Sequence, residues 1–396
     1  MAYPIAAVGL GLFLYALIPA FVRGWRYAFC DADALPMLND APIKGDALRL
    51  LCYLLLGSFV VYGTALLFTG SLNSLVQADA LHYTEIAKNG YTNVGETRYF
   101  IVFFPLFPLC MRLLTYLLGD ALFAAIVLNN GFLFVAMWYL YKMGCRVYGR
   151  KTALRSAKYL SLFPFALFFR NPYTESLFVM LSVMSIYYAM DGRHLTSGVM
   201  GLLCALCRST GVILMLPILM ESVRAWRMGQ QKLWIAILAT LLPLGGFAIY
   251  LGLNYAVTGN ALQFLIYQRE HWYNGFALFP HSLFETADYM LHNTQPSLAP
   301  FWVSQFLAIM VFSFLLAAGC KHLHPTHSAY ALAGFFIMLS QDWLLSGGRY
   351  LMGIAIPFYI PALWAKKPMP DAAVTALCVM GLLYLSCVFC MGTPLY

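Results

Sequence analysis

Charge is what this sequence has least of. Asp, Glu, Lys and Arg make up 10% of its 396 residues, whereas about a quarter is usual in soluble domains. So little charge cannot cover a water-facing surface, which excludes a soluble enzyme and a disordered chain. Several apolar runs reach the roughly 20 residues that a membrane-crossing helix needs. Because the alternating pattern of barrel strands is missing, the sequence predicts an all-α polytopic membrane protein.

Other signatures are missing too. We find no Gly-rich loop of the P-loop or dinucleotide-binding type. The ten cysteines, including those of Cys204-x-x-Cys207 and Cys387-x-x-Cys390, lie mostly in or beside apolar runs without a nearby histidine, so we interpret them as small apolar residues. The net charge of +8 comes from short clusters between apolar runs. Such clusters are typical of membrane topology signals and not of nucleic-acid binding.

The apolar runs predict one membrane-embedded domain, 1–396, with about twelve membrane segments. Eight runs are predicted as spans: 2–22, 48–70, 119–141, 233–255, 299–319, 328–345, 349–365 and 370–393. The first lacks a basic leader and is expected to be retained. Two longer runs, 157–189 and 195–223, are interrupted by polar residues at Arg170–Glu175 and Arg208–Gly211. We expect each to be a hairpin of two short helices with its polar tip at one membrane face. Segment 99–118 contains two prolines and suits an interfacial or re-entrant piece.

Lysines and arginines predict the orientation, because cytoplasmic loops carry an excess of both. With Arg49 at the edge of the first, 17 of the 24 basic residues lie in six loops, 23–48, 142–158, 190–195, 224–232, 320–327 and 366–370. We expect these loops in the cytoplasm and both termini outside. Nine of the sixteen carboxylates share the other face with the remaining basic residues, although charges at apolar helix ends are costly. We therefore expect the chemistry on that outer face.

The first outer loop, 71–118, holds the richest set of polar residues, and a second long outer loop is predicted at 256–298. Read as a helix, the stretch 77–91 places Asp79 and His82 on one face. A carboxylate at the start of such a membrane-surface helix can reach a polar headgroup. The aromatic and proline-rich segment 103–108 that follows suits the membrane interface.

This loop resembles a known family. The pattern D-A-x-x-Y-x-x-I-A-x-x-G-Y, from Asp79 to Tyr91, followed by F-F-P-L-F-P, is typical of the PIG-V family, the GPI mannosyltransferase II proteins and their prokaryotic relatives. The resemblance continues in order at Pro172–Phe178, Arg208–Gly211 and Arg349-Tyr350, and so spans roughly residues 77–350. One departure is Ala78, because the family commonly has Trp before the aspartate.

The resemblance implies a GT-C membrane fold and transfer of a sugar, typically mannose, from a polyprenyl-phosphate donor to a lipid or glycan acceptor on the non-cytoplasmic face. It implies no cofactor and no metal. The transfer needs a base for the acceptor hydroxyl and cations for the leaving phosphate. We expect Asp79 to be that base. Arginines suit the phosphate because their guanidinium forks match its oxygens. The expected substrate-binding residues are His82, Tyr83, Glu85, Arg170, Tyr173, Glu175, Arg208, His271 and Arg349.

Structural roles are the alternatives for these residues. Asp79 would cap the loop helix, Glu175 and Tyr173 would cap the helix after the first hairpin tip, and Arg208 and Arg349 would pair with Glu175 or Asp342. A metal site formed by Asp79, His82 and Glu85 is a further alternative. The stretch 268–272 suits sugar contacts or is simply solvated. The segment 346–348, Ser-Gly-Gly, is expected to let the backbone before Arg349 approach a headgroup closely.

Two other classes of protein remain as alternatives. One is a lipid-linked-sugar flippase or transporter, in which the charged hairpin tips line a pathway. Against it, the charges gather on one face, and we find no inverted repeat of the whole chain. The other is a non-catalytic assembly subunit. In each case we expect a multi-pass protein surrounded by membrane lipids, in the plasma membrane of a prokaryote or the endoplasmic reticulum of a eukaryote.

Overall fold

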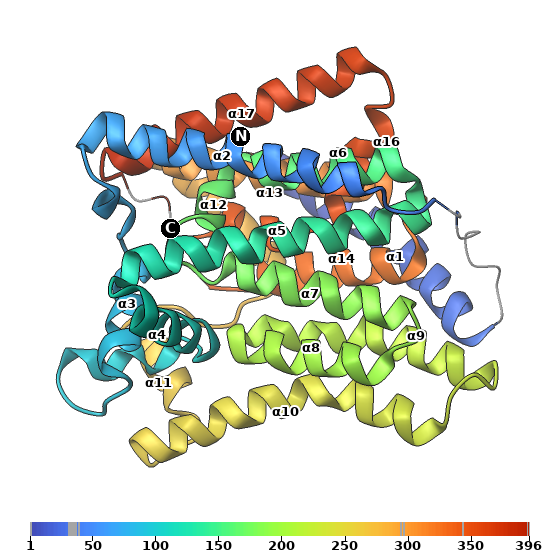
Figure 1. The fold of residues 1–396 in the computed structure, drawn as a ribbon, viewed down its shortest axis with the longest axis horizontal. Coiled ribbons are helices and arrows are strands. Elements are labelled where there is room, and N and C mark those ends of the chain that lie inside the picture. Colours follow the sequence, from blue (N-terminus) through green and yellow to red (C-terminus); the bar gives the residue numbers. More distant parts are fainter. Residues whose placement is uncertain are drawn as a thin grey trace.

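The computed structural model describes residues 2–30, 38, 40–293, 295, 298–342, 344–393 and 395. Within these residues the regular structure is entirely helical, and the helices run side by side between the two ends of one bundle (Figure 1). The predicted all-α class is confirmed.

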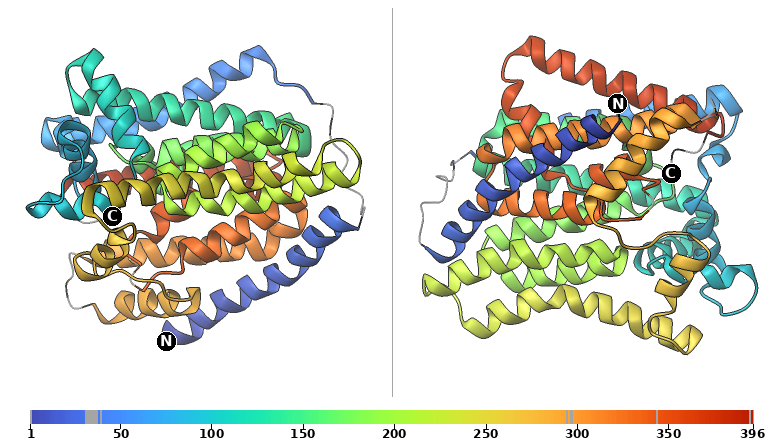
Figure 2. Two further views of the ribbon diagram at one scale, coloured as in Figure 1. Left: turned by 90° about the horizontal axis from the view of Figure 1, so that it is seen from below. Right: turned by 180° about the vertical axis from the view of Figure 1, so that it is seen from behind.

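Six described helices are long and apolar enough to cross a membrane, so the chain is a multi-pass membrane protein. They are α1 (Ala2–Phe29), α2 (Lys44–Thr69), α5 (Ala121–Tyr148), α10 (Leu233–Thr258), α13 (Ala299–Gly319) and α17 (Pro368–Cys390). Each coincides with a predicted span. Two of them end at a glycine in the left-handed conformation, Gly70 (φ 71°) and Gly259 (φ 76°), as helix C-termini commonly do. Helix α1 packs obliquely against α12 (Phe279–His292), α13 and α14 (Pro325–Met338) at one side of the bundle (Figure 2).

Shorter helices fill the space between these six. They are α6 (Arg150–Leu162), η3 (Pro164–Phe169), α7 (Glu175–Met190), α8 (His194–Cys207), η4 (Ser209–Leu214) and α9 (Met215–Arg227). Both long runs break where predicted, between η3 and α7 and between α8 and η4. Pro164 and Pro172 lie at or near the first break, and proline cannot continue a helix because it lacks the N–H and clashes with the preceding turn.

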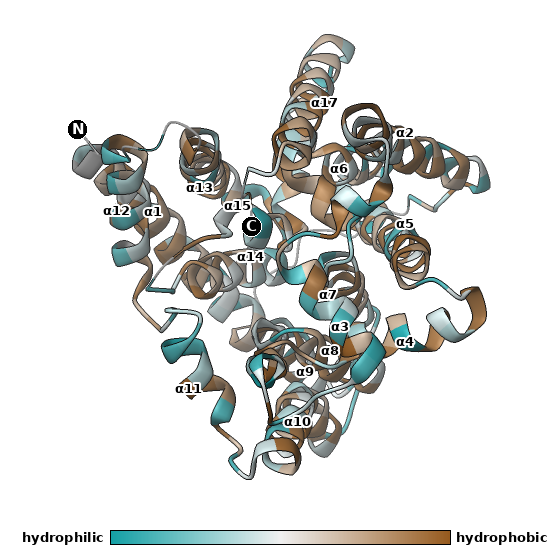
Figure 3. Ribbon diagram, turned by 90° about the vertical axis from the view of Figure 1, so that its left-hand side faces the viewer, coloured by the Kyte–Doolittle hydropathy of each residue, from teal (hydrophilic) through white to brown (hydrophobic). Residues whose placement is uncertain are grey.

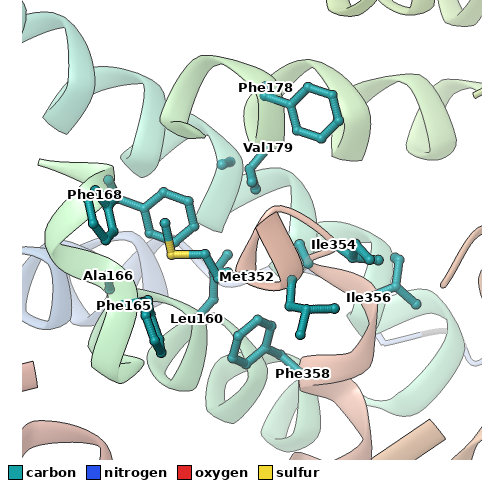
Figure 4. Close-up of a cluster of buried hydrophobic side chains, with 14 of the residues drawn as sticks. Leu160, Phe165, Ala166, Phe168, Phe178, Val179, Met352, Ile354, Ile356 and Phe358 are labelled. Atoms are coloured by element: carbon teal, nitrogen blue, oxygen red, sulfur yellow. The ribbon is translucent and has the colours of Figure 1, made fainter. Parts of the chain in front are cut away.

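Two predicted spans, 328–345 and 349–365, are wrong as single helices. The first run contains α14 (Pro325–Met338), which ends early. The second is divided into α15 (Gly347–Met352), η7 (Ile356–Phe358) and α16 (Tyr359–Trp364), because Gly353 and Pro357 interrupt it. This broken segment is buried instead of facing lipid. Its Met352 and Phe358 lie in a hydrophobic cluster with Phe165, Phe168 and Phe178 of η3 and α7 (Figure 4).

The first outer loop forms several short helices at one end of the bundle (Figure 1). They are η1 (Leu72–Leu75), α3 (Asp79–Asn89), η2 (Glu96–Val102) and α4 (Leu106–Leu118). Helices η2 and α4 meet at 114°, so segment 99–118 is not a straight span. The second outer loop contributes α11 (Gln263–Glu270) and α12 (Phe279–His292), and α11 lies at the same end as α3 and α4.

The basic loops gather at the opposite end, where η6 (Cys320–His322) also lies. Three ion pairs join these loops to one another or to the helix ends beside them. They are Arg150–Asp46, Arg146–Asp191 and Lys158–Asp371, with nitrogen–oxygen distances of 2.6, 2.6 and 2.7 Å. In addition, Arg23 donates a hydrogen bond to Leu323 O, and Arg224 donates one to Tyr27 O. Residues 31–37 and 39 of the loop 23–48 lie outside the described residues. The loops predicted to share the cytoplasmic side therefore do share one end of the bundle.

Candidate functional site

A cavity of about 1050 Å³ opens at the end of the bundle that carries α3 and α11. Figure 3 views this end, with α3, α7, α8 and α11 around the centre. Six of the candidate residues line the cavity: Asp79, His82, Tyr83, Glu175, Arg208 and Arg349. They come from four separate stretches of sequence, so the fold brings together most of the site that the motifs predicted.

Four of these side chains form a continuous line of alternating charge. Arg349 Nη1 lies 2.7 Å from Asp79 Oδ2, and Arg349 Nε lies 3.3 Å from Glu175 Oε1. On the other side of Glu175, Arg208 Nη1 donates a 2.5 Å hydrogen bond to the same oxygen. Only 2% of the Glu175 side chain and 5% of the Arg349 side chain are exposed. We call Asp79, Arg349, Glu175 and Arg208 the ionic cluster; its formal charges sum to zero.

Aromatic rings hold the two guanidinium groups of the ionic cluster in place. Arg349 lies over Tyr173 and Tyr350, each with its ring centroid at 5.2 Å, and Arg208 lies over Tyr350 at 4.8 Å. Such cation–π contacts are favourable, the more so when desolvated. The Tyr173 hydroxyl in turn donates to Gln77 O at 2.9 Å, which ties the first hairpin tip to the residues just before Asp79. Tyr173 therefore contacts the ionic cluster through Arg349 but does not line the cavity.

The backbone before Asp79 is strained. Ala78, at the position where the family commonly has Trp, has φ 48° and ψ −124°, a left-handed conformation that costs a residue with a side chain about 1–3 kcal/mol. Asp79 is the first residue of α3, and among the described residues its carboxylate accepts a hydrogen bond from Arg349 and none from a backbone N–H of the helix. The capping alternative therefore does not describe Asp79, and Glu175, first in α7, likewise pairs with arginine instead of capping.

Several buried polar atoms of the cavity lining lack a hydrogen-bond partner within the described residues: Glu175 Oε2, Arg349 Nε, Thr210 Oγ1 and Trp272 Nε1. A buried polar atom without a partner costs about 1–3 kcal/mol, and most such atoms in native proteins are paired. Such atoms also occur elsewhere among the described residues, but these four belong to residues that border a space a polar ligand can occupy.

His82 lies one helical turn after Asp79 and is surrounded by rings. The centroids of Phe100, Phe103 and Trp272 are 4.4, 5.0 and 5.2 Å from that of His82. Burial lowers the pKa of His82 below its usual value, although nearby Asp79 acts in the opposite direction. The imidazole is therefore neutral at pH 7, with one nitrogen able to donate and the other able to accept a hydrogen bond.

Three predicted site residues lie elsewhere. Glu85 accepts a 2.6 Å hydrogen bond from Asn89, and His271 stacks on Tyr99 with centroids 3.9 Å apart; neither lines the cavity. Arg170 differs most from the prediction, since its side chain is fully buried.

Arg170 donates to Ser161 O, Ala166 O and Leu54 O at 2.9–3.2 Å, which fastens the break after α6 to α2. Gly57 of α2 makes room for this guanidinium, because a Cβ there would overlap Arg170 Nη2. Arg170 bonds to backbone carbonyls inside the bundle and does not line the cavity.

The glycines before Arg349 also differ from the prediction. A Cβ at Gly348 would overlap the Phe165 ring, and the Gly348 N–H donates to Gln305 Oε1 at 2.6 Å. Gly348 thus lets α15 pack closely on η3 instead of opening the backbone to a headgroup. Among the described residues Arg349 pairs with Asp79 and Glu175 and not with Asp342, and Arg208 also pairs with Glu175.

The three side chains of the alternative metal site have separate partners. Asp79 pairs with Arg349, His82 packs among aromatic rings, and Glu85 bonds to Asn89. Across the described ranges, no group of three or more His, Cys, Asp or Glu side chains is arranged to hold a metal ion.

Sequence reasoning missed two aromatic residues of the site, Trp272 and Tyr350. Trp272 lies in the stretch 268–272, where the sequence analysis predicts its neighbour His271 as a substrate-binding residue. Nothing in the local pattern distinguishes the two, because the direction of each ring depends on contacts with α3 and η2 that are distant in sequence. Tyr350 belongs to the Arg349-Tyr350 motif and was treated as a marker only.

The comparison with protein families bears directly on this arrangement. Residues 44–228 match the family Mannosyltransferase (PIG-V). The resemblance to the PIG-V family is confirmed. The matched region contains Asp79, Glu175 and Arg208, whereas Arg349 lies beyond it.

Curated relatives agree with the PIG-V match. GPI alpha-1,6-mannosyltransferase 2 of Cricetulus griseus is 30% identical over 158 residues, which cover 37% of this chain and 31% of the relative. The enzyme of the same name from Rattus norvegicus is 30% identical over 164 residues, covering 37% and 32%. The similarity thus spans about a third of the length of these relatives.

Among solved structures, the chain is similar to an oligosaccharyltransferase of Archaeoglobus fulgidus complexed with Zn and sulfate. The TM-score is 0.42 at 10% identity, over 99% of this chain and 53% of the other. A structure of the archaeal oligosaccharyltransferase from the same organism, with an inhibitory peptide and a dolichol-phosphate, gives 0.40 at 9% identity, over 100% and 56%.

Proposed function

We propose that this protein is an inverting glycosyltransferase of GT-C type that moves a mannosyl group from a polyprenyl-phosphate donor to a lipid or glycan acceptor on the non-cytoplasmic membrane face. The observation that carries the proposal is the ionic cluster: a carboxylate and two arginines meet at a cavity within a membrane protein whose matched family consists of mannosyltransferases.

In this proposal Asp79 is the general base. It takes the proton from the acceptor hydroxyl while that oxygen forms a bond to the anomeric carbon. The bond from the anomeric carbon to the phosphate oxygen breaks on the opposite face, so the configuration inverts. Among the described residues no donor bonds to Asp79 Oδ1, which leaves this oxygen able to accept the proton. A positioned base typically contributes about 10²–10⁴-fold to the rate.

The two arginines hold the phosphate. The donor is a phosphodiester with one negative charge. The polyprenyl phosphate that leaves it is a monoester with about two negative charges. Asp79 loses one negative charge when it accepts the proton, so the total charge of the site is unchanged by the reaction. Protonation of Asp79 removes one of the two negative charges beside Arg349 at the moment when the leaving group needs a cation. Preorganised charges of this kind stabilise a transition state without reorganisation at the moment of reaction.

A transfer assay tests the proposal. The purified protein in detergent is incubated with labelled polyprenyl-phosphate mannose and a panel of lipid and glycan acceptors. Appearance of label in an acceptor is the expected result. Movement of the labelled lipid across a reconstituted bilayer, without transfer to any acceptor, would instead favour a flippase.

The membrane face is tested separately. Asn89, exposed at the end of α3, is changed to Cys in a variant whose ten native cysteines are replaced. We expect a membrane-impermeant thiol reagent to label this variant in intact cells, or in sealed right-side-out vesicles. Labelling only after lysis would contradict the proposed face.

A further inference from the structure

One wall of the cavity is aromatic. It consists of His82, Phe103 and Trp272, which all line the cavity, and we call it the aromatic wall. The Trp272 centroid lies 5.2 Å from that of His82 and 5.4 Å from that of Phe103, with the rings nearly perpendicular at 79° and 90°. These are favourable edge-to-face contacts, so the three rings support one another as a unit.

The aromatic wall also carries hydrogen-bonding groups that the protein leaves unused. The Trp272 indole N–H is buried and has no acceptor within the described part of the chain. Buried Trp N–H groups usually find a partner. The neutral His82 imidazole adds a donor and an acceptor, and no protein hydrogen bond to it occurs among the described residues. The wall therefore offers apolar ring surface together with hydrogen-bonding nitrogens.

The residues just after Trp272 are hydrogen-bonded to Gln341 and Asp342. Asn274 Nδ2 donates to Gln341 Oε1, and the Asp342 N–H donates to Gly275 O, both at 3.0 Å. A Cβ at Gly275 would overlap the Asp342 carboxylate, so the absence of a side chain there leaves room for Asp342. Between Trp272 and Asn274, Tyr273 has φ 49°, a strained conformation that the surroundings must hold. Trp272 of the aromatic wall is thus held two residues before a stretch that is bonded to Gln341 and Asp342.

We infer that the aromatic wall binds a pyranose ring beside the ionic cluster, with Trp272 as the specificity-determining residue. The inference rests on the proposed glycosyltransferase function. A pyranose presents C–H groups on its faces and hydroxyls at its rim. The C–H groups pack on aromatic rings through weak contacts, and the hydroxyls match the Trp272 N–H and the His82 nitrogens. A long apolar tail would match the rings but would leave those polar groups unpaired.

The pyranose at the aromatic wall would be either the transferred sugar of the donor or a sugar of a glycan acceptor. Kinetic measurements distinguish these two possibilities. Trp272→Leu is compared with Trp272→Phe, which keeps a ring but loses the N–H, and with Trp234→Leu, a matched change at an exposed residue of α10. KM is measured for the donor at saturating acceptor and for the acceptor at saturating donor. The inhibition constant of sugar-free polyprenyl phosphate is measured in parallel.

For Trp272→Leu we expect KM to rise about tenfold for the substrate whose sugar contacts the wall, which corresponds to about 1.4 kcal/mol of lost binding. Trp272→Phe should lie between it and the wild type. The inhibition constant of polyprenyl phosphate should change less than twofold, and Trp234→Leu should match the wild type. Unchanged KM values for both substrates, or an equal loss of polyprenyl phosphate binding, would overturn the inference.

A binding measurement without turnover keeps the inference separate from the proposed function. Saturation-transfer NMR with methyl α-mannopyranoside should give a signal with the wild type and Trp234→Leu that is strongly reduced with Trp272→Leu. If this signal behaves as expected while no donor supports transfer, the sugar site stands and the proposed reaction fails. If transfer occurs and the signal is the same in all variants, the sugar site fails and the reaction stands.

Discussion

Two clusters of carboxylates and arginines lie at opposite ends of the same bundle, and they are built differently. At the basic end, both oxygens of buried Asp46 are occupied: Arg150 bonds to them through Nη2 and Nε at 2.7 and 2.6 Å, and the Tyr141 hydroxyl and Arg49 add further bonds. At the other end, Glu175 Oε2 and Arg349 Nε have no hydrogen-bond partner among the described residues, and the cluster borders the cavity of about 1050 Å³.

Under the proposed function, this difference separates a structural ion pair from a substrate-binding cluster. The Asp46 pair is bidentate, which is the strongest arginine–carboxylate geometry, and its hydrogen bonds are complete within the protein. In the ionic cluster Glu175 Oε2 has no hydrogen-bond partner among the described residues, and Arg349 Nε meets Glu175 Oε1 only as an ion pair at 3.3 Å. Both atoms therefore keep hydrogen-bonding capacity that a ligand can use. An ion pair in a membrane protein is therefore most informative about function when some of its polar atoms have no hydrogen-bond partner within the protein.

The largest expected effect is that of Asp79→Asn. The amide keeps the size of the side chain but cannot take the acceptor's proton, so transfer per folded molecule should fall by about 10²–10⁴-fold. Donor binding, measured by equilibrium dialysis with labelled donor, should persist. Near-normal turnover in a folded variant would remove Asp79 as the base and make Glu175 the next carboxylate to test.

A smaller loss is expected from Arg208→Ala and Arg349→Lys. Each weakens the cationic grip on the donor phosphate, and removal of a charge-assisted hydrogen bond costs about 1.5–3 kcal/mol, or roughly 10- to 150-fold in affinity. Lysine at 349 keeps the charge but loses the fork that serves both Asp79 and Glu175. The readout is the KM for donor, and an unchanged value in both variants would count against a phosphate site at the cluster.

Asp46→Asn should reverse the pattern. The amide weakens the bidentate pair with Arg150, which is 30% exposed, and the contact with Arg49, which is 58% exposed. Because Asp46 itself is buried, we expect a loss of about 1–3 kcal/mol in the free energy of unfolding. Transfer per folded molecule should change less than twofold. Thermal unfolding in detergent, together with activity normalised to folded protein, checks both. A selective loss of turnover at unchanged stability would erase the distinction between the two clusters.

Chelation should have the smallest effect. If arginines alone neutralise the phosphate, activity in excess EDTA should stay within about twofold of the untreated enzyme, because the proposed charge stabilisation comes from side chains. Complete loss with EDTA, restored by a divalent cation, would turn Asp79 from a base into a metal ligand.

The sequence was informative where the signal was local. Apolar runs located the six long helices, the polar interruptions located both hairpin tips, and the three-residue spacing of Asp79 and His82 placed them on one cavity-facing side of α3. It was also informative about the overall charge distribution, because the basic loops do contact one another at one end.

Pairing between distant residues could not be predicted. The line from Asp79 through Arg349 and Glu175 to Arg208 joins residues up to 270 positions apart, and nothing in a single sequence specifies it. Arg170 lies in the sequence beside other polar residues of the first hairpin tip, so the sequence predicts it in the site. In the structure its guanidinium is buried in the bundle, where Gly57 leaves room for it. The run 349–365 is apolar enough for a span, but Gly353 and Pro357 interrupt it and make it a buried, broken segment.

The configuration of the product tests the central claim most directly. One round of transfer is run from a donor whose mannosyl phosphate is β-linked, and the anomeric signals of the product are read by NMR. Direct displacement with Asp79 as base predicts an α-linked product in the wild type, formed at least 10²-fold more slowly by Asp79→Asn. A β-linked product would contradict the single displacement, and equal rates in the two proteins would contradict the role of Asp79.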